Sequence, residues 1–420
     1  MDKHYSDNDI VIVEATRSIL GSTTGSLKGF TAAELGRHIL SGLLSRVEKR
    51  SKSFSRDQVR HLIIGQCVGS GIGQNLPRQI ARLCDMNNIE SSFVVNEMCG
   101  SGLEAIILGA RSLRLDEYPL SIIGGIEVPS RAPYFITREQ LVEWKDKTVE
   151  EIGEMLIRAD VCDALWCKMY DVHTVVHAED TTREWVKKNN IDPEKFKLAI
   201  DEYAVMSHQR ALKAIREGAL KEEITPIAGA SETDELPAER KLKTLQRQAG
   251  TRYTPKGMFI SNYNSPPPAN AAVFMMIMKY KEALRLGLQP IARIAGHAGA
   301  GVPPKKFLLA PIKAIKRLFE KTGTALRDHD LLEINPAYGP QILFCKKELG
   351  LDLEKVNIYG DCIAYGHPVG AAGARLTTTL LYALKRKKAG RGLVSICLGG
   401  GNALALAVER VDQNNIKGLK

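Results

Sequence analysis

The sequence predicts an α/β fold in which two similar halves flank a largely helical insertion. Short β-branched runs alternate with segments of helical periodicity over residues 1–128, and this alternation returns over residues 260–420. Residues 129–259 are rich in charge and show helical periodicity without the strand runs. Each half also contains a glycine-rich elbow, a helical segment and a glycine-ended strand in that order, as duplication of one α/β unit would leave.

The elements of the first half follow from the spacing of its apolar residues. Apolar residues at helical spacing predict helices over 31–44, where Thr31 and Glu34 suggest a capping box, and over 102–114. Strands are predicted over 9–18, 59–69 and 119–127, and residues 91–102 are interpreted as a strand that enters a glycine-rich elbow.

The insertion and the second half continue the pattern. Helices are predicted over 181–190, 193–215 and 311–323, and strands over 331–339, 355–366 and 391–410. Because strands alternate with helices in both halves, we expect a mainly parallel sheet that is covered on both faces.

Charge excludes some classes of partner. The formal net charge is +10, which favours anionic partners such as phosphorylated ligands. The basic residues are spread out, and a cluster such as 385–388 is interpreted as solvated surface. No recognised nucleic-acid-binding module accompanies the charge, so no nucleic-acid partner is expected.

Cysteine usage and the N-terminal residues predict a cytoplasmic protein. Residues 1–9 are polar and lack the apolar core of a signal peptide, and no stretch reaches the ~18 apolar residues of a membrane span. The eight cysteines are therefore expected to be free thiols in a reducing compartment. Cys162 and Cys167 have no second pair, so no metal site is expected.

Cys99 is the first candidate for chemistry, because it lies between a predicted strand and a predicted helix start. The positive end of a helix dipole favours a thiolate, and Gly100 and Gly102 would let the backbone approach a ligand closely. The alternative is a buried structural thiol, since cysteine is among the most buried residue types. The elbow alone leaves both interpretations open.

Three further residues stand in suggestive but individually ambiguous settings. His367 lies in the glycine-rich GHPVGAAGA, where it could equally be a loop histidine satisfied locally. Cys397 precedes three glycines whose backbone N–H groups could face an oxyanion, although such triplets are more often tight turns. Asn335 precedes a proline and could be a turn residue.

Two thiols and an imidazole together fit Claisen chemistry. Such a reaction needs a nucleophile that holds an acyl group, a base that removes an α-proton and stabilisation of two oxyanions. A histidine can activate the first thiol, and a second thiol can exchange protons with carbon.

The chain resembles the thiolase family along nearly its whole length. IVIVEATRSILG, GQCVGSGIGQNLPRQIA, NEMCGSGLEAI, GGIEVPSRAPY, GHPVGAAGAR and CLGGGNALA are similar to successive family segments and occur in family order. The resemblance implies that Cys99 is the acylated nucleophile, that His367 activates it, and that Cys397 is the acid/base at the α-carbon. It further implies one oxyanion hole from the backbone N–H groups of Cys99 and Gly399, and another from His367 with a water held by Asn335.

The resemblance also implies a binding region for coenzyme A. His173, in DVHTVVHAED, falls where the family has a histidine near the pantetheine, and Asn264 and Tyr338 fall in pocket segments. Several of these segments depart from the family pattern and put acetoacetyl-CoA in doubt as the substrate. NEAF is NPAY at 335–338, GNAS is SNYN at 261–264, NGGAIALGHP is YGDCIAYGHP at 359–368, and GTTAEN is VVHAED at 175–180.

The fold that the resemblance implies is five layers, αβαβα, with 1–128 and 260–420 as the two halves and 129–259 as the inserted CoA-binding region. A homodimer or homotetramer is implied, with CoA thioesters as substrates and no metal or prosthetic group.

Three alternatives to an active thiolase are considered. A decarboxylating ketoacyl synthase shares this fold but pairs one cysteine with two histidines or a histidine and an asparagine, which Cys397 argues against. A degenerate thiolase that binds acyl-CoA without turnover is motivated by the altered segments. A cysteine-protease interpretation of Cys99, His367 and Asn335 leaves Cys397 unexplained.

Overall fold

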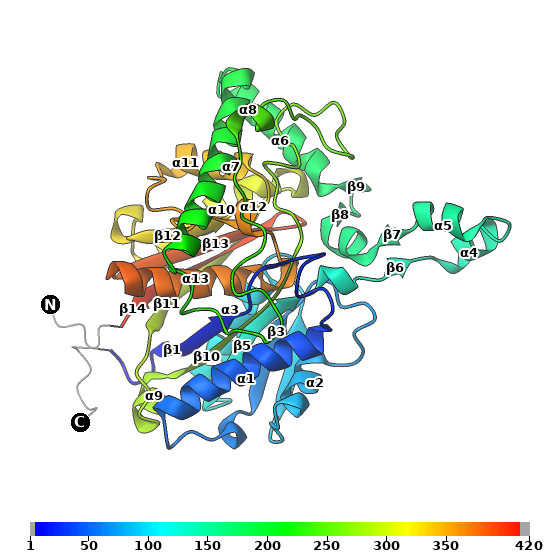
Figure 1. Ribbon diagram of the computed structural model, residues 1–420. Coiled ribbons are helices and arrows are strands. Elements are labelled where there is room, and N and C mark those ends of the chain that lie inside the picture. The colour runs from blue at the N-terminus through cyan, green and yellow to red at the C-terminus, as the bar shows by residue number, and fades with distance from the viewer. Residues whose placement is uncertain (1–4, 412–420) are drawn as a thin grey trace.

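The computed structural model of the chain describes residues 5–411 and contains one large mixed sheet (Figure 1). The strand order in this ten-stranded sheet is β12-β13-β14-β11-β1-β10-β5-β3-β4, and β2 pairs with β10. The strands are β1 (Ile10–Arg17), β2 (Gly21–Ser22), β3 (His61–Gly65), β4 (Ser91–Val95), β5 (Leu120–Glu127), β10 (Ala269–Lys279), β11 (Ala292–Gly301), β12 (Leu331–Asn335), β13 (Arg391–Leu398) and β14 (Asn402–Arg410).

The two halves of the sheet form two layers, and helices outside and between them complete the five predicted layers. Helices α1 (Ala32–Arg50) and α2 (Leu76–Leu83) cover the first half of the sheet, and α10 (Ala310–Thr322) and α11 (Pro340–Leu349) cover the second. Helices α3 (Ser101–Arg114) and α13 (Ala372–Lys387) pack against each other between the two halves (Figure 1). The predicted α/β fold of two similar halves is confirmed, as is the capping box of Thr31 and Glu34.

Strand β1 illustrates how the sequence builds the layers. Its alternate residues Val11 and Val13 belong to the outer core beneath α1, whereas Ile10 and Ile12 belong to the core around α3 and α13. A strand buried on both faces reads as a continuous apolar run, which is the signal that the sequence carries at this point.

The expectation of a mainly parallel sheet is wrong. The pairs β3–β4, β3–β5 and β12–β13 are parallel, but β10 lies antiparallel between β1 and β5, and β14 lies antiparallel between β13 and β11. Strand β10 follows the insertion in sequence but pairs with strands of the first half. Strand β14 follows β13 after a short glycine-rich turn and pairs with it directly. The alternation of strands and helices along the chain does not reveal either of these connections.

The strand predicted over 355–366 is also wrong. Only Val356 bridges to β12, through Leu332, and the chain then turns through Asn357 (φ 50°) and Gly360 (φ 88°). Asp361 caps the short helix α12 (Cys362–Tyr365), which ends at Gly366. The apolar residues of this segment are therefore buried in turns rather than in a ladder.

Glycines allow the two central elbows to approach each other closely. A Cβ at Gly102 would lie 2.9 Å from the carbonyl oxygen of Gly370, and one at Gly373 would lie 2.5 Å from the backbone nitrogen of Leu103. Gly102 therefore serves helix packing rather than approach to a ligand, contrary to expectation. This packing brings the loop that carries Cys99 against the loop that carries His367.

The insertion is anchored to β1 by a buried ion-pair cluster. The Arg17 guanidinium donates to Glu223 at 2.6 Å and to both carboxylate oxygens of Asp234 at 2.7 and 2.9 Å. Arg17 is 1% exposed. Because buried charges are tolerated only when they are paired, this cluster fixes the end of the first strand to the segment that follows the long helices of the insertion.

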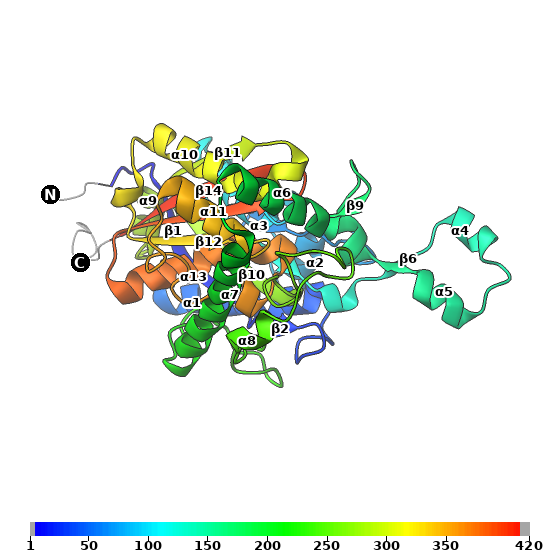
Figure 2. The ribbon, with the colours of Figure 1, turned by 90° about the horizontal axis from the view of Figure 1, so that it is seen from above.

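An arm projects from the body of the molecule within the insertion (Figure 2). It consists of β6 (Tyr134–Phe135), α4 (Arg138–Glu143), α5 (Val149–Met155) and β7 (Ile157–Arg158), with β6 and β7 paired. The remaining elements are β8 (Trp166–Cys167), β9 (Val172–His173), α6 (Thr174–Lys188), α7 (Pro193–Arg216), α8 (Leu242–Leu245), α9 (Tyr280–Arg285), a π-helix (Asp160–Leu165) and the 3-10 helices Arg56–Gln58, Pro129–Arg131, Pro304–Leu309, Leu326–Asp328 and Val369–Ala371. Within residues 5–411, no helix has the length and apolar character of a membrane span.

Candidate active site

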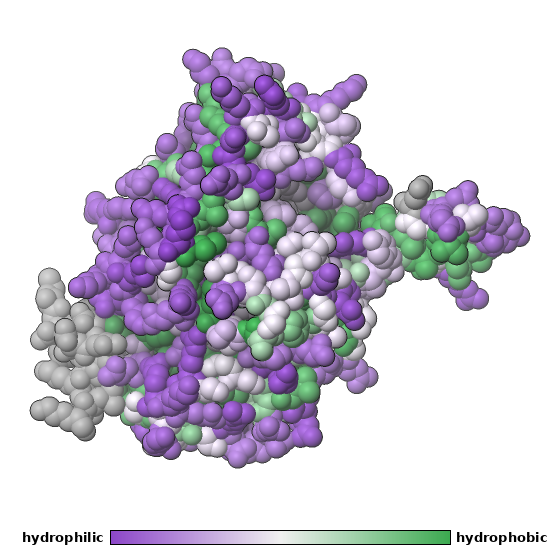
Figure 3. Space-filling model, in the orientation of Figure 1, coloured by the Kyte–Doolittle hydropathy of each residue, from purple (hydrophilic) through white to green (hydrophobic). Residues whose placement is uncertain are grey.

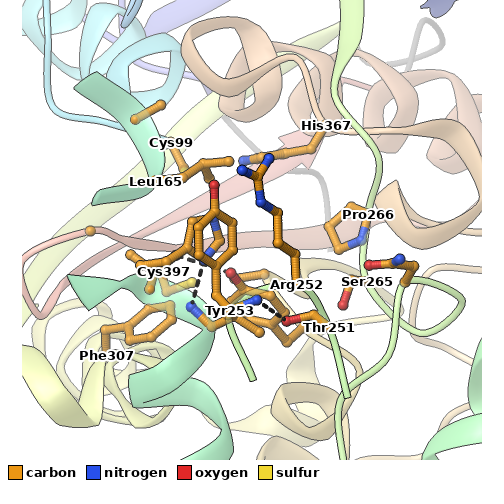
Figure 4. Close-up of a pocket in the computed structure, with 18 residues that line it drawn as sticks. Cys99, Leu165, Thr251, Arg252, Tyr253, Ser265, Pro266, Phe307, His367 and Cys397 are labelled. Atoms are coloured by element: carbon orange, nitrogen blue, oxygen red, sulfur yellow. Dashed lines mark hydrogen bonds between the residues drawn. The ribbon is translucent and has the colours of Figure 1, made fainter. Parts of the chain in front are cut away.

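A cavity of about 230 Å³ opens where the elbows of both halves meet the insertion (Figure 4). It brings together Cys99, His367, Cys397, Gly399, His173 and Tyr338 of the residues predicted from sequence. Asn335 and Asn264 do not line it. The other lining residues are Ala164, Leu165, Thr174, Val175, Thr251, Arg252, Tyr253, Asn262, Ser265, Pro266, Phe307 and Ala337.

Cys99 stands on a sharp, internally bonded turn between β4 and α3. Met98, directly before it, has a φ of 51°, a conformation that non-glycine residues rarely adopt. The Ser101 hydroxyl donates to the Met98 carbonyl at 2.6 Å and accepts from the Glu97 N–H at 2.8 Å. A strained turn held from both sides presents a nucleophile on a fixed backbone, as in other strand-to-helix elbows.

The electrostatic setting of Cys99 differs from the expectation of a stabilised thiolate. Burial raises the pKa of the Cys99 thiol to about 12, and the nearby Glu127 carboxylate acts in the same direction. These effects outweigh the backbone hydrogen bond that lowers the pKa. Cys99 is therefore a thiol at neutral pH, and a nucleophilic step at this residue requires a base.

His367 has the properties of such a base. Its backbone N–H donates to the Pro267 carbonyl at 2.7 Å, and its side chain points toward Cys99 in Figure 4. Burial, together with the positive charge of Arg375, lowers the imidazole pKa to about 3, so the ring is neutral at physiological pH. Neither ring nitrogen has a hydrogen-bond partner among residues 5–411. A neutral imidazole with a free ring nitrogen can accept the thiol proton.

Cys397, at the end of β13, is held by a residue that no sequence pattern indicated. Its thiol donates to the Oε1 atom of Gln341 at 3.1 Å. The same oxygen accepts the Ala337 N–H at 3.1 Å, and the Gln341 amide donates to the Asn335 carbonyl at 2.7 Å. Gln341 is fully buried, and these hydrogen bonds link Cys397 to the NPAY segment.

The charge state of Cys99 affects the pKa of Cys397. Burial raises the pKa of Cys397 well above its ordinary value, and a negative charge on Cys99 raises it further. The two sulfurs therefore do not carry charge at the same time, which suits a pair in which one thiol is acylated while the other moves a proton.

The glycine triplet contacts the nucleophile's turn. Gly400 and Gly401 have φ values of 93° and 97°, and a Cβ at Gly401 would lie 2.3 Å from the Val302 carbonyl oxygen. The Cα of Gly399 lies close to the turn before Cys99, since a Cβ there would meet the Met98 side chain at 3.5 Å. Gly400 and Gly401 are therefore required by this turn, which sets Gly399 beside Cys99 at the pocket wall.

Asn335 and Asn264 occupy different positions from the pocket lining. Asn335 is fully buried at the end of β12, and neither atom of its side-chain amide has a partner among the described residues. Asn264 closes a turn, accepting from the Ser261 N–H and donating to Asp201 and to the Phe259 carbonyl, each at 3.0 Å. The next residue, Ser265, reaches the pocket in its place.

His173 and Tyr338 form part of the wall on the side of the insertion. The Nδ1 atom of His173 accepts from the Val175 N–H at 3.2 Å, so the neutral ring carries its proton on Nε2. Burial lowers the pKa of His173 to about 4. The Tyr338 hydroxyl is hydrogen-bonded to that of Thr174 at 3.0 Å, which fixes the phenol at the wall.

A second cavity of about 800 Å³ shares Ala164, Thr174, Phe307 and Gly399 with the first, and extends along the insertion. Cys162 and Cys167 both line it. Over residues 5–411, no cluster of histidine, cysteine and carboxylate side chains could hold a metal ion.

Family models, related sequences and solved structures all match this chain to thiolases over most of its length. The N-terminal domain of thiolase matches residues 10–250, and the C-terminal domain of thiolase matches residues 288–410. An acetyl-CoA acetyltransferase from Pseudomonas aeruginosa is 35% identical, covering 96% of this chain and 99% of that protein. The cytosolic acetyl-CoA acetyltransferase of Mus musculus is 32% identical over 96% of this chain and 98% of its own length. The thiolase Acat5 from Ascaris suum, solved in complex with coenzyme A, has a TM-score of 0.85 at 28% identity and covers 96% of this chain and 100% of that one.

Proposed function

Because this chain belongs to the thiolase family and is an acyltransferase of that family, we propose that it acts as an acetyl-CoA C-acyltransferase. It makes or cleaves the carbon–carbon bond of a 3-ketoacyl-CoA, and one of the two products or substrates is acetyl-CoA. The observation that carries this proposal is that Cys99, His367 and Cys397 line one pocket.

The cleavage half of the reaction starts at Cys99. Its thiol passes a proton to neutral His367 while the sulfur attacks the 3-keto carbon of the substrate. The bond between the α- and β-carbons then breaks, and the Cys397 thiol donates a proton to the α-carbon. Acetyl-CoA leaves, and the remaining acyl group stays on Cys99 as a thioester.

The transfer half restores the enzyme. The Cys397 thiolate takes the thiol proton of incoming CoA, whose sulfur attacks the acyl group on Cys99. The Cys99 sulfur leaves and recovers its proton from His367. Backbone N–H groups of Cys99 and Gly399 are proposed to stabilise one oxyanion, and His367 with a water held by Asn335 the other.

CoA thioesters enter as substrates, and no metal or prosthetic group is required by these steps. His173 and Tyr338 are proposed to contact the pantetheine arm, for which the adjoining cavity of about 800 Å³ offers an approach. Asn264 is proposed to support this wall indirectly. Its side chain accepts the Ser261 N–H and so fixes the turn that is followed by Ser265, which lines the pocket.

The proposed active form is a homodimer or homotetramer. Strand β4 is an edge strand whose Phe93 and Val94 are exposed, and an open apolar edge favours pairing with a second copy. Apolar side chains also gather on the projecting arm (Figure 3), where Leu141, Val142 and Val149 are 58%, 65% and 82% exposed. Exposed apolar patches of this kind mark contacts between proteins.

A cytoplasmic location is proposed for the chain. The mouse relative at 32% identity is named as cytosolic, which supports it. Fractionation of the source cells with antibodies against the full chain would test it.

Thiolysis by the purified chain tests the function. Acetoacetyl-CoA and longer 3-ketoacyl-CoA thioesters are mixed with CoA, and acetyl-CoA production is followed for the wild type and for Cys99→Ala. Turnover by the wild type alone is expected. CoA-thioester binding without turnover in the wild type would indicate a degenerate thiolase, and faster consumption of malonyl-CoA than of acetyl-CoA would indicate a decarboxylating synthase.

A further inference from the structure

A tight turn holds Arg252 at the edge of the active-site pocket. The backbones of Thr251 and Thr254 exchange two hydrogen bonds of 3.1 Å, and their hydroxyls are 2.9 Å apart. Gly250 enters the turn with a φ of 75°, where a Cβ would lie 2.5 Å from the Thr254 carbonyl oxygen. The turn is therefore closed by its own bonds and presents Arg252 on a fixed backbone.

Aromatic stacking attaches this turn to the pocket wall. The ring of Tyr253 lies 4.2 Å from that of His173 with an angle of 6° between the planes, and Trp166 packs edge-on against Tyr253. Because His173 also caps helix α6, the position of the turn is tied to the main body of the insertion. Arg252 therefore extends from a supported element rather than from a loose loop.

Arg252 is the only charged side chain among the described residues that line this pocket. The rest of the lining is apolar or neutral, since burial keeps both His173 and His367 uncharged. Arg252 is an exposed residue at the edge of the pocket, no ion pair of its guanidinium is found among residues 5–411, and its Cζ lies over the Tyr253 ring, 5.9 Å from the ring centroid. In Figure 4 its side chain extends across the pocket toward the side on which Cys99 and His367 lie.

An unpaired guanidinium in a pocket that lacks carboxylates is suited to a planar anionic group on the ligand. We propose that Arg252 binds a carboxylate at the far end of the acyl group, so that the preferred substrates are short 3-ketoacyl-CoA thioesters that end in a carboxylate. This proposal rests on the proposed thiolase function. The bond changes are those of ordinary thiolysis, and the products are acetyl-CoA and the CoA monothioester of a dicarboxylic acid.

The phosphates of CoA are the other anionic groups that the substrate brings. They lie at the end of the pantetheine arm that is remote from the thioester. Arg252, by contrast, shares its pocket with both reactive thiols. The position of Arg252 beside the reacting end therefore favours the acyl carboxylate.

Matched substrates test this assignment. Values of kcat/KM are measured for 3-ketoadipyl-CoA, which ends in a carboxylate, and for 3-ketohexanoyl-CoA, its neutral counterpart of equal chain length. The wild type is expected to prefer the carboxylated substrate. Arg252→Gln is expected to lower the ratio of the two values by roughly 10–100-fold, as loss of one charge-assisted hydrogen-bonding group does. Arg252→Lys should retain part of the preference.

Lys256→Gln is the matched control, because Lys256 follows the same turn and is exposed but does not line the pocket. Its ratio should equal that of the wild type. N-acetylcysteamine thioesters of both acyl groups, which lack phosphate, should show the same loss of preference in Arg252→Gln.

An equal loss for both CoA thioesters, with none for the N-acetylcysteamine thioesters, would overturn the proposal and assign Arg252 to a CoA phosphate. An unchanged ratio would also overturn it. Thiolysis of acetoacetyl-CoA by the same preparation separates these results from failure of the thiolase function itself, in which no substrate would react.

Discussion

The thiol of Cys397 donates a hydrogen bond to the side-chain oxygen of Gln341, 3.1 Å away, in a fully buried position. Because that oxygen is only an acceptor, it favours the protonated form of the thiol and fixes the direction of its proton. The Gln341 amide nitrogen is committed to the Asn335 carbonyl, so the orientation of the amide is set. We therefore infer that Gln341 positions the Cys397 thiol for the proposed carbon–carbon step.

Gln341→Leu should separate the two half-reactions. The leucine side chain offers no hydrogen-bond acceptor to orient the Cys397 thiol. Cleavage and condensation are therefore expected to fall by roughly 10–100-fold. Exchange of an acyl group between Cys99 and free CoA should fall much less, and the pH profile of condensation should shift, because the proton on Cys397 is held differently. Gln341→Glu, which retains the acceptor, should recover part of the activity. A merely structural role would instead reduce exchange and condensation by the same factor with no shift in the profile.

The pH dependence of alkylation at Cys99 reports its protonation state. Because burial raises the thiol pKa to about 12 and lowers that of His367 to about 3, the resting pair is neutral. Below the thiol pKa, each pH unit raises the thiolate fraction tenfold. The rate of inactivation by iodoacetamide is therefore expected to rise about tenfold per unit from about pH 6 to about pH 9.

Mass spectrometry of the modified peptide, with Cys99→Ala as the control for other cysteines, assigns the alkylation rate to Cys99. A rate that is already high and flat through this range would indicate a thiolate–imidazolium pair, and the neutral pair would then be wrong.

Tyr338 is expected to limit the length of the acyl group as well as to contact the pantetheine arm, because it lines the pocket that holds Cys99 and Cys397. Its hydroxyl is tied to Thr174 and its ring packs edge-on against Phe307, with ring centroids 6.3 Å apart. Tyr338→Ala should open this wall and move the chain-length optimum in thiolysis toward longer 3-ketoacyl groups. Tyr359→Phe is the control, because Tyr359 does not line the pocket and its hydroxyl has no partner in the described part of the chain. An unchanged optimum in Tyr338→Ala would show that another side chain sets the limit.

Stability depends on the Arg17 cluster. Arg17→Met leaves Glu223 and Asp234 buried without their partner, and breaking a buried pair in this way costs roughly 3–5 kcal/mol of unfolding free energy. Arg60→Ala removes an exposed pair with Glu90, whose side chains are 51% and 54% exposed, and should cost at most about 1 kcal/mol. Urea unfolding of both variants measures the difference. Similar losses in the two variants would contradict the role given to Arg17.

The sequence revealed the residues whose surroundings are local. Cys99, His367 and Cys397 each stand in a glycine-rich turn next to a strand or helix, so both their presence and their backbone setting could be predicted. Strand β1 could also be predicted, because a strand buried on both faces is a continuous apolar run and does not alternate apolar with polar residues.

Residues whose roles depend on distant contacts could not be predicted in the same way. Gln341 is hydrogen-bonded to Cys397, which lies 56 residues further along the chain at the end of β13. Arg252 faces the pocket because of the closure of its turn and the stacking of Tyr253 on His173. Asn264 was predicted for the pocket, but its side chain closes a turn through Ser261, Asp201 and Phe259, and the next residue, Ser265, lines the pocket. The insertion of β10 between β1 and β5 has no local signal at all.

The division of labour between Cys99 and Cys397 is tested most directly by acyl–CoA exchange in Cys397→Ala, measured beside the condensation rate of the same variant. Exchange starts from the resting enzyme, in which Cys397 keeps its proton, so it needs only Cys99, His367 and the oxyanion donors, all of which remain. His367 takes the Cys99 proton as the sulfur attacks the acyl-CoA and passes it to the departing CoA sulfur, and the return of CoA reverses this path. Condensation also needs the proton carrier at the α-carbon, and its loss is expected to be roughly 10²–10⁴-fold, with no exchange of the acetyl-CoA α-protons for deuterium. Exchange that persists while condensation is lost is the predicted result. Equal loss of both would contradict it, because Cys397 would then support the nucleophile or the fold rather than carry the proton.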